Sequence, residues 1–405
     1  MSDTESRRTL VLMAAASLLC MSPWFSATVV LPQLERLWQA DIGLAAWLTM
    51  AVQLGFVVGG LISALFNLPD RFSAPRVFVV SSLLAAAVNA GFATVAADNI
   101  PAALVMRFLT GAFLAGVYPP GMKILAGWFR DGRGTALGIL VGALTVGKAL
   151  PYSVAAAGDL PWRVIVLSCS GLAVLGAFLV ALGVKEGPYA ALQPPLDLHQ
   201  IGAVFRNRGA RLANFGYFGH MWELYSMWGW IALLLGASAG GQNQAVALVA
   251  FLSIAIGAVG CVWAGWAADA GAAASLEARV ARRARVTIIA MAVSGVCCLL
   301  AAVFFQHFWL LVIICLVWGA AVVADSAQFS TIVSEVSDRC YVGTALTVQT
   351  AIGFLLTVVS LRVVGAIGAS YGWNWAAASM AIGPALGILA MGRLLHKPFT
   401  VSAEG

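Results

Sequence analysis

The sequence is short of charge. Only 10% of its 405 residues are Asp, Glu, Lys or Arg, whereas 61% are hydrophobic. A water-soluble domain usually carries about 25% charged residues, because it needs them to cover its surface. The composition therefore excludes a soluble globular protein.

Patterns that mark catalysis or metal binding are also missing. The chain has no Gly-Lys-Ser/Thr phosphate loop and no His-Glu-x-x-His pair. Nearly all of its seven cysteines fall inside apolar runs, without the spacing of a metal site or a disulfide framework. We therefore predict no enzyme activity, no catalytic residue, no metal, no cofactor and no ATP-driven pumping.

Long hydrophobic runs, in contrast, recur along the whole chain. A helix of roughly 18 apolar residues or more crosses a hydrocarbon core about 30 Å thick. Such segments must be helical, because unpaired backbone groups cannot face lipid. We predict an all-α polytopic membrane protein with about twelve transmembrane helices, at residues 9–34, 43–67, 76–97, 100–128, 134–157, 162–184, 211–236, 243–268, 286–305, 308–334, 342–368 and 373–394.

The chain divides near its middle at a longer polar connection. Leu198, Ile201 and Phe205 form an amphipathic pattern there, which predicts a short helix on the membrane surface. The run Gly-Thr-Ala-Leu begins at Gly134 and again at Gly343, at equivalent places in the two halves, and indicates an internal repeat. We predict an N-terminal six-helix bundle (1–187), a cytoplasmic linker (188–210) and a C-terminal six-helix bundle (211–405).

The basic residues indicate an orientation. With both termini in the cytoplasm, most of the 23 Lys and Arg residues fall on that side, and only Arg36 and Arg163 fall outside. This asymmetry accounts for the net charge of +6 without a nucleic-acid partner. The first apolar stretch is longer than a signal peptide requires, so we expect it to remain as a helix. We predict a multi-pass protein of a bacterial inner (plasma) membrane, working as a monomer.

Two loops and one helix carry a resemblance to a known family. Asp70-Arg71-Phe72 is followed by Arg76 between the second and third spans, and Gly265-Trp-Ala-Ala-Asp269 lies at the matching loop of the second half. Together with Arg107-Phe-Leu-Thr-Gly111 in the fourth span, they resemble motifs of the major facilitator superfamily. The resemblance covers essentially the whole chain and implies two six-helix bundles, with gating loops that contain Asp70, Arg71, Arg76 and Asp269.

Within the superfamily, the fifth span is loosely similar to nitrate/nitrite- and cyanate-permease-like members. The cue is Trp128-Phe129-Arg130, which leads into a series of glycines and Pro151. Nitrate porters bind their anion with arginines in the second and eighth spans, and neither span contains an arginine here. This difference argues against nitrate itself as the solute.

A few polar side chains fall within the spans and mark a candidate site. Ionisable groups are costly in hydrocarbon and usually line a cavity or pair with one another, and a solute site between two bundles is expected near mid-depth. Aromatic residues on the first and seventh spans are candidates to line the same cavity. We predict a cavity lined by Trp24, Arg107, Tyr118, Lys148, Trp222, Tyr225 and Gln328.

The seventh span carries two titratable groups on one face. His220 and Glu223 are three residues apart, among aromatic side chains that favour the neutral forms of both. We predict that they, with Asp325, couple transport to protons. The alternative is a hydrogen-bonded pair that only holds this helix against a neighbour.

Two further contacts are hypotheses from depth alone. Lys148 and Glu223 lie at similar depth in different halves and would form a salt bridge that closes the cavity; alternatively, each charge is neutralised within its own bundle. Arg107 would bind an anionic group of the solute, or it would hold the end of the fourth span through backbone carbonyls.

These features predict a secondary transporter that moves a small polar or anionic solute by alternating access, coupled to protons. Its partners would be the solute, protons and the lipid bilayer. One alternative is proton-driven efflux of hydrophobic or cationic compounds, for which the aromatic seventh span with Glu223 is the cue. A more distant one is a non-transporting sensor or scaffold, although the loops are short for a partner surface.

Overall fold

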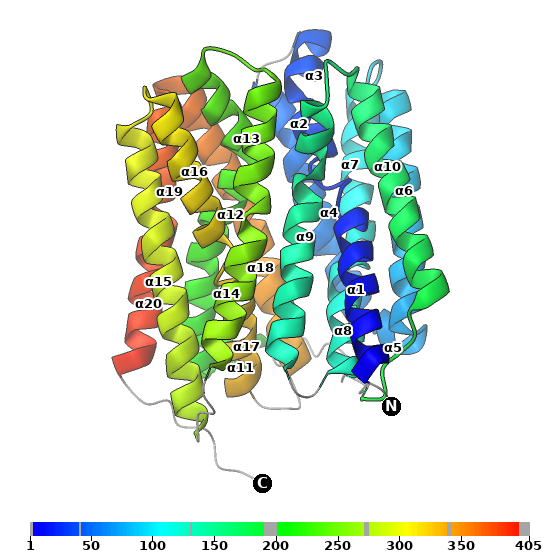
Figure 1. Cartoon of the computed structure of the whole chain (residues 1–405), viewed down its shortest axis with the longest axis vertical. Helices are drawn as coiled ribbons and strands as arrows, with labels where there is room; N and C mark the ends of the chain where they lie inside the picture. The colour runs from blue at the N-terminus through cyan, green and yellow to red at the C-terminus, as the bar shows by residue number, and fades with distance from the viewer. Residues whose placement is uncertain are drawn as a thin grey trace.

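The computed structural model describes residues 3–39, 42–129, 132–189, 201–270, 275–337 and 342–396. Every regular element in these ranges is a helix, and most helices run along the long axis of the molecule (Figure 1). Ten helical stretches of the described chain are long and apolar enough to cross a membrane. The two other predicted spans are the broken first one and the seventh, α12 (Arg208–Ala239), which also run along this axis (Figure 1). The prediction of an all-α, two-bundle membrane protein is confirmed.

The helices of the first half form what we call the N-terminal bundle, at one side of Figure 1. They are α1 (Asp3–Cys20), α2 (Ser26–Val29), α3 (Leu31–Trp38), α4 (Ile42–Leu65), α5 (Leu68–Arg71), α6 (Ala74–Val95), α7 (Ile100–Leu114), α8 (Tyr118–Trp128), α9 (Arg133–Ala156) and α10 (Trp162–Gly183).

The helices of the second half form the C-terminal bundle at the other side. They are α12 (Arg208–Ala239), α13 (Gln244–Ala255), α14 (Gly257–Asp269), α15 (Leu276–Val303), α16 (Phe308–Val322), α17 (Ser326–Val336), α18 (Val342–Tyr371), α19 (Trp373–Met380) and α20 (Ile382–His396). The short α11 (Ile201–Arg206) lies within the predicted linker, whose residues 190–200 are outside the described ranges.

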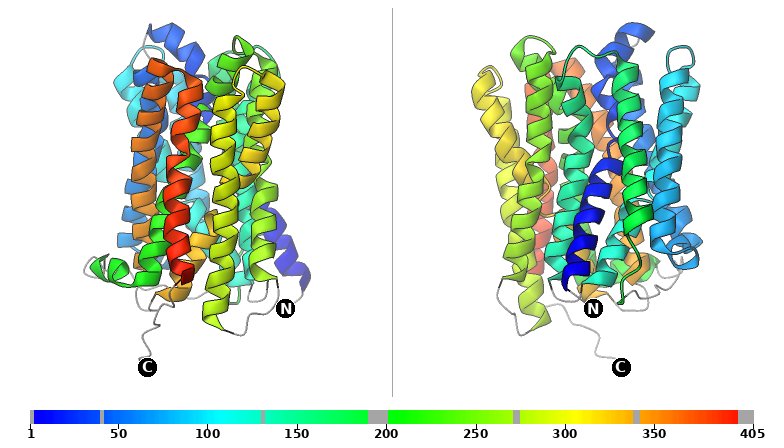
Figure 2. Two further views of the ribbon diagram at one scale, coloured as in Figure 1. Left: turned by 90° about the vertical axis from the view of Figure 1, so that its left-hand side faces the viewer. Right: turned by 45° about the vertical axis from the view of Figure 1, so that its right-hand side comes forward.

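The start of α1 and the end of α20 lie at the same end of the molecule, which we call the terminal end; the opposite end, where α3 lies, is the far end (Figures 1 and 2). Both Gly-Thr-Ala-Leu runs open a helix at the terminal end, on α9 and on α18. The fourth and tenth spans are each broken near the middle, between α7 and α8 and between α16 and α17. The two halves therefore share this helix break and these helix starts, although the break in the first span has no counterpart in α12.

The first span is interrupted between Cys20 and Ser26, where Pro23 cannot continue the helical hydrogen bonds. The carbonyl groups freed there need donors, because no water is present in the hydrocarbon to replace them. Arg107 of α7 supplies them: its guanidinium donates to the Pro23 carbonyl at 3.1 Å and to the Trp24 carbonyl at 2.7 Å. It also donates to the Asn89 side-chain oxygen at 2.8 Å.

These contacts correct two expectations for Arg107. Its side chain is fully buried and is directed at the backbone of the first span, not into a solute cavity. It holds the break in the first span rather than the end of its own. The physical reason is that a broken membrane helix exposes carbonyl oxygens, which a guanidinium with five N–H groups can satisfy together.

We expect Arg107→Met to destabilise the folded protein by about 3 kcal/mol or more, because it removes the buried hydrogen bonds to the Pro23, Trp24 and Asn89 oxygens, which Ser26 replaces only in part. Thermal unfolding of the purified protein should show a melting temperature lower by several degrees. Arg163→Met is the matched control, since Arg163 is exposed and contacts only the Trp162 ring. Equal melting temperatures for the two variants would contradict this role of Arg107.

Candidate functional site

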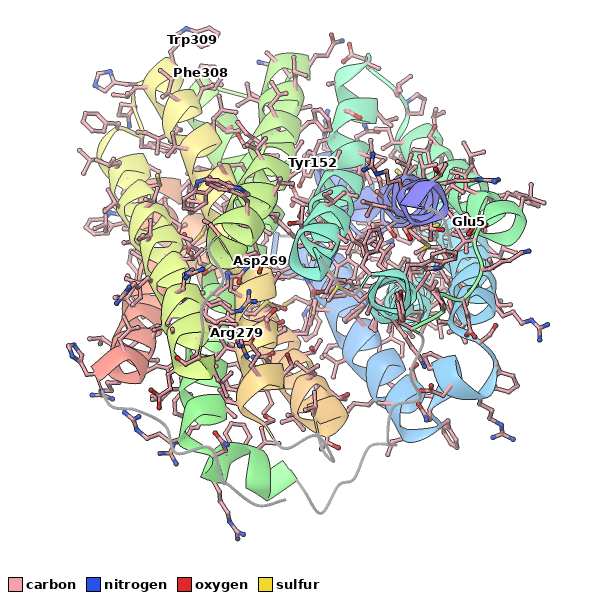
Figure 3. All side chains as sticks on the ribbon, turned by 60° about the horizontal axis from the view of Figure 1, so that its bottom comes forward. Glu5, Tyr152, Asp269, Arg279, Phe308 and Trp309 are labelled. Atoms are coloured by element: carbon pink, nitrogen blue, oxygen red, sulfur yellow. The ribbon has the colours of Figure 1, made fainter. Side chains whose placement is uncertain are left out.

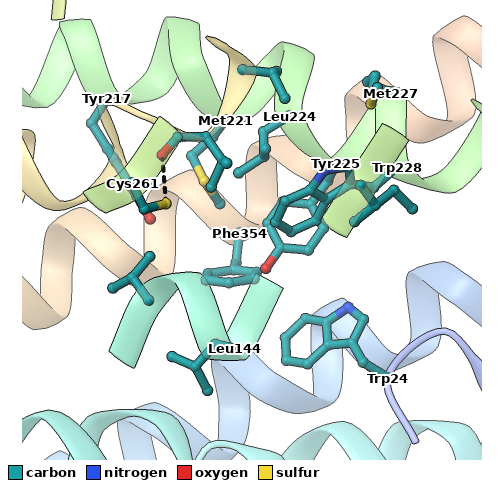
Figure 4. Close-up of a cluster of buried hydrophobic side chains, with 14 of the residues drawn as sticks. Trp24, Leu144, Tyr217, Met221, Leu224, Tyr225, Met227, Trp228, Cys261 and Phe354 are labelled. Carbon is teal, nitrogen blue, oxygen red and sulfur yellow. Dashed lines mark hydrogen bonds between the residues drawn. The ribbon is translucent and has the colours of Figure 1, made fainter. Parts of the chain in front are cut away.

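Five aromatic side chains close the middle of the molecule between the bundles. Trp24 and Phe56 come from the N-terminal bundle, and Tyr225, Trp228 and Phe354 come from the C-terminal bundle. Ring centroids lie 5.8 Å apart for Trp24 and Tyr225, and 4.5 Å apart for Phe56 and Phe354. Figure 4 shows Trp24 facing Tyr225, Trp228 and Phe354. We call these five residues the aromatic plug; rings at such separations attract one another and leave no room for water.

Lys148 of α9 lies in the aromatic plug with only 9% of its surface exposed. Its ammonium donates to the Tyr225 hydroxyl at 2.6 Å. It also lies 4.6 Å from the ring centroid of Trp24 and 5.1 Å from that of Trp228. Each cation–ring contact contributes up to about 2 kcal/mol when water is excluded.

No carboxylate of the described residues forms an ion pair with Lys148. In a site without water, a carboxylate stabilises a cation more strongly than a phenol and aromatic ring faces do. The ammonium is therefore a buried positive charge, and pairing it with an anion would stabilise it further.

A cavity lies on either side of the plug. The cavity toward the terminal end has a volume of about 290 Å³ and is lined by Phe56, Tyr118 and Lys123 from one bundle and by Ser330 and Thr347, among others, from the other. The cavity at the far end, of about 770 Å³, is lined by residues that include Arg36, Tyr152 and Gln242. Tyr152, which lines the far-end cavity, donates from its hydroxyl to the carbonyl of the plug residue Trp228 at 3.3 Å. The plug therefore lies between the two cavities.

The predicted cavity residues are thus brought together only in part. Trp24, Lys148 and Tyr225 meet in the plug, and Tyr118 lines the terminal-end cavity. Trp222 lies instead in a groove on the outer side of the C-terminal bundle, between α12 and α20.

Glu223 is enclosed within the C-terminal bundle. Its carboxylate accepts hydrogen bonds from Trp318 Nε1 at 2.6 Å, Cys298 Sγ at 3.1 Å and Ser294 Oγ at 2.9 Å. The predicted salt bridge with Lys148 is wrong, because these three donors hold the carboxylate away from the plug. The carboxylate is hydrogen-bonded within its own bundle, which agrees with the alternative that each charge is neutralised inside one bundle.

His220 pairs with Asp325, which lies in the break before α17. The Nδ1 atom of His220 is 2.8 Å from Oδ1 of Asp325, and its Nε2 atom is 2.7 Å from the Ser326 hydroxyl. Both side chains are almost fully buried. The proton-coupling candidates therefore form two separate sites along α12: His220 with Asp325 from the tenth span, and Glu223 with its own three donors.

Gln328 belongs to a network at the terminal end. Its side-chain oxygen accepts from Arg283 at 2.8 Å, and Arg283 lies 3.3 Å from Asp269 and 3.6 Å from Glu335. Figure 3 shows Asp269 at this end, close to Arg279. Gln328 lines neither cavity beside the plug. Its position supports a structural role in this network.

Asp269 is the member of the predicted gating loops that reaches the other bundle. A methyl group added at Gly134, in the first turn of α9, would lie 2.2 Å from its Oδ2 atom. A carboxylate at the start of a helix is stabilised by the backbone dipole. Asp269 therefore links the C-terminal bundle to α9 at the terminal end.

The first-half loop makes its contacts within its own bundle. Asp70 forms an ion pair with Lys123 of α8 beside the terminal-end cavity. Arg71 lies over the Phe72 ring, and Arg76 is exposed. The gating roles of these three residues stay predictions.

A closed aromatic plug between two bundles, with a cavity toward each end of the molecule, is the arrangement expected of a membrane transporter. The sequence matches the Major Facilitator Superfamily over residues 13–276, more than half of the chain. The protein belongs to this family, whose members are transporters and not enzymes.

Among solved structures, the fold is similar to that of the proton:xylose symporter XylE bound to 6-bromo-6-deoxy-D-glucose. The TM-score is 0.68 with 15% sequence identity, and the match covers 96% of this chain and 95% of that one. At this identity the likeness shows the fold alone. No curated protein sequence matches the chain.

We expect Gly134→Ala to weaken the contact between the bundles at the terminal end, because the new methyl group displaces the Asp269 carboxylate. Backbone amides in the first turns of α9 and the last turns of α14 should then exchange with deuterium faster than in the wild type. Gly171→Ala is the control, since a methyl group there meets nothing within 4 Å. Unchanged exchange in Gly134→Ala would exclude Asp269 as a link between the bundles.

Proposed function

We propose that this transporter moves a small anionic or polar solute through the aromatic plug by alternating access. The observation that carries this proposal is Lys148: a buried ammonium at the contact between the bundles, which pairs with no carboxylate in the part of the chain that the structure describes. A cavity approaches the plug from each end, so a solute anion can reach this charge from either side once the plug opens. An anion fits the loose likeness of α9 to nitrate/nitrite- and cyanate-permease-like members, although α4, α13 and α14 contain no arginine.

We further infer that transport is coupled to protons at the two sites on α12. Glu223 and the His220–Asp325 pair are buried groups that can each hold a proton, and both Glu223 and His220 lie on the helix that carries Tyr225. A change in their protonation alters the charge along α12, the helix whose Tyr225 and Trp228 contact Lys148. Binding of solute and of protons can then favour different arrangements of the bundles, as coupling requires.

A second candidate function is efflux of organic cations. The specific observation is that three aromatic rings already surround an ammonium group at 4.6 to 5.1 Å. If Lys148 moves away, the same rings can hold a cationic solute. A panel of ligands distinguishes this function from the first.

We also propose that the terminal end faces the cytoplasm of a bacterial cell and that a monomer is sufficient. Exposed basic side chains at this end, on α6, α11, α15 and α20, agree with such an orientation. The plug and both cavities are built by a single chain.

We expect Lys148→Met to weaken the binding of small oxyanions and carboxylates at least about tenfold, which corresponds to about 1.4 kcal/mol. Calorimetric titration with a panel of anions, followed by uptake into liposomes, measures this effect. Lys185→Met removes an exposed charge far from the plug and should bind anions as the wild type does. Unchanged anion uptake by Lys148→Met would refute the proposal, and binding of lipophilic cations alone would favour efflux.

We expect Glu223→Gln to separate exchange from accumulation. The glutamine oxygen can still accept from Trp318, so the helix packing is retained, but the side chain no longer takes up a proton. Counterflow of labelled solute should persist, whereas accumulation driven by a pH gradient should be lost. Glu277→Gln, at an exposed position on α15, is the control. Normal gradient-driven accumulation by Glu223→Gln would show that its carboxylate is not needed for coupling.

A further inference from the structure

A groove of about 1050 Å³ runs along the outer side of the C-terminal bundle, between α12 and α20. The two helices approach closely at its floor: a methyl group added at Gly219 would lie 2.4 Å from the Gly383 carbonyl oxygen. Small residues at this contact leave the larger side chains on either side as walls. Figure 2 (left) shows α20 on the outer side of the bundle, where nothing from the other bundle covers it.

The walls of the groove are apolar and face outward. Phe215, Ile382, Leu386 and Leu389 line it, with exposed fractions between 48% and 60%. From Arg211 to Trp222 the groove follows α12 for a rise of about 16 Å. This is close to the thickness of one leaflet, about half of a 30 Å hydrocarbon core. The groove therefore has the length and the polarity of an acyl chain.

The mouth of the groove at the terminal end is basic. Arg208, Arg211, Arg393 and His396 line it, and none of the residues that line the groove is acidic. Arg208 donates to the Arg393 carbonyl at 2.8 Å, which fixes the two ends of α12 and α20 together. Arg211 and Arg393 are exposed, and no described carboxylate pairs with either of them.

We propose that this groove binds one anionic phospholipid from the leaflet at the terminal end. Its phosphate lies between Arg211 and Arg393, and one acyl chain lies along α12 and α20 as far as Trp222. A phosphate matches the planar, multiple N–H donors of arginine, and basic residues at a membrane surface attract anionic lipid. The same α12 carries Tyr225 and Trp228, so the bound lipid packs against the helix that encloses Lys148.

The test uses the full-length protein, delipidated in detergent, and native mass spectrometry with equal amounts of phosphatidylglycerol and phosphatidylcholine. The wild type should retain one phosphatidylglycerol in preference to phosphatidylcholine. Arg211→Gln combined with Arg393→Gln should lower that binding roughly tenfold or more. Lys185→Gln combined with Arg206→Gln removes the same charge from exposed positions outside the groove and should leave it unchanged.

A second variant tests the apolar part independently of charge. Leu386→Trp places a larger side chain in the groove at an exposed position and should also displace phosphatidylglycerol. Melting temperatures in lipid-free detergent establish that each variant is folded. Equal retention of both lipids by the wild type would overturn the proposal. So would an equal effect of the two charge pairs, or full binding by Leu386→Trp.

Discussion

A backbone carbonyl within a membrane must find a donor inside the protein, and this requirement shapes the centre of the molecule. The first span breaks at Pro23, and Arg107 satisfies the carbonyls that the break exposes. With its backbone held in this way, Trp24 leaves the helical path and reaches Tyr225 and Phe354 of the other bundle. The contact between the bundles at the plug therefore depends on a buried arginine that lines neither cavity beside the plug.

The second feature of the molecule is the separation of its buried charges. Lys148 belongs to the N-terminal bundle and is held by a phenol and aromatic rings, whereas Glu223 and the His220–Asp325 pair are enclosed by the C-terminal bundle. Opposite charges in hydrocarbon normally pair directly, because each is costly alone. Here each is stabilised by neutral or local partners, so the bundles can move apart without breaking a buried ion pair between them.

Much of this arrangement can be predicted from the sequence, because bilayer thickness sets the length of each helix. The predicted span 162–184 is α10 (Trp162–Gly183), and the predicted start at residue 342 is the start of α18. What a helix faces is harder to predict. Membrane-exposed and buried surfaces are both apolar, so hydropathy does not show that Tyr225 faces the plug while Trp222, on the same helix, lines the outer groove.

Partners that are distant in sequence were missed for the same reason. Ser294, Cys298 and Trp318 surround Glu223 from α15 and α16, and only the rotation of those helices brings them there. The four-residue spacing of Ser294 and Cys298, which places them on one helix face, was the available signal. The direction of the Arg107 side chain follows from a helix break that composition does not locate.

The isolated ammonium of Lys148 also has an electrical consequence. A unit charge that crosses a membrane potential of 100 mV changes its free energy by about 2.3 kcal/mol. Under the proposed function, a monovalent anion that pairs with Lys148 cancels this charge, whereas the empty carrier keeps it. Membrane voltage would then act on the return of the empty carrier and leave the loaded step nearly unaffected.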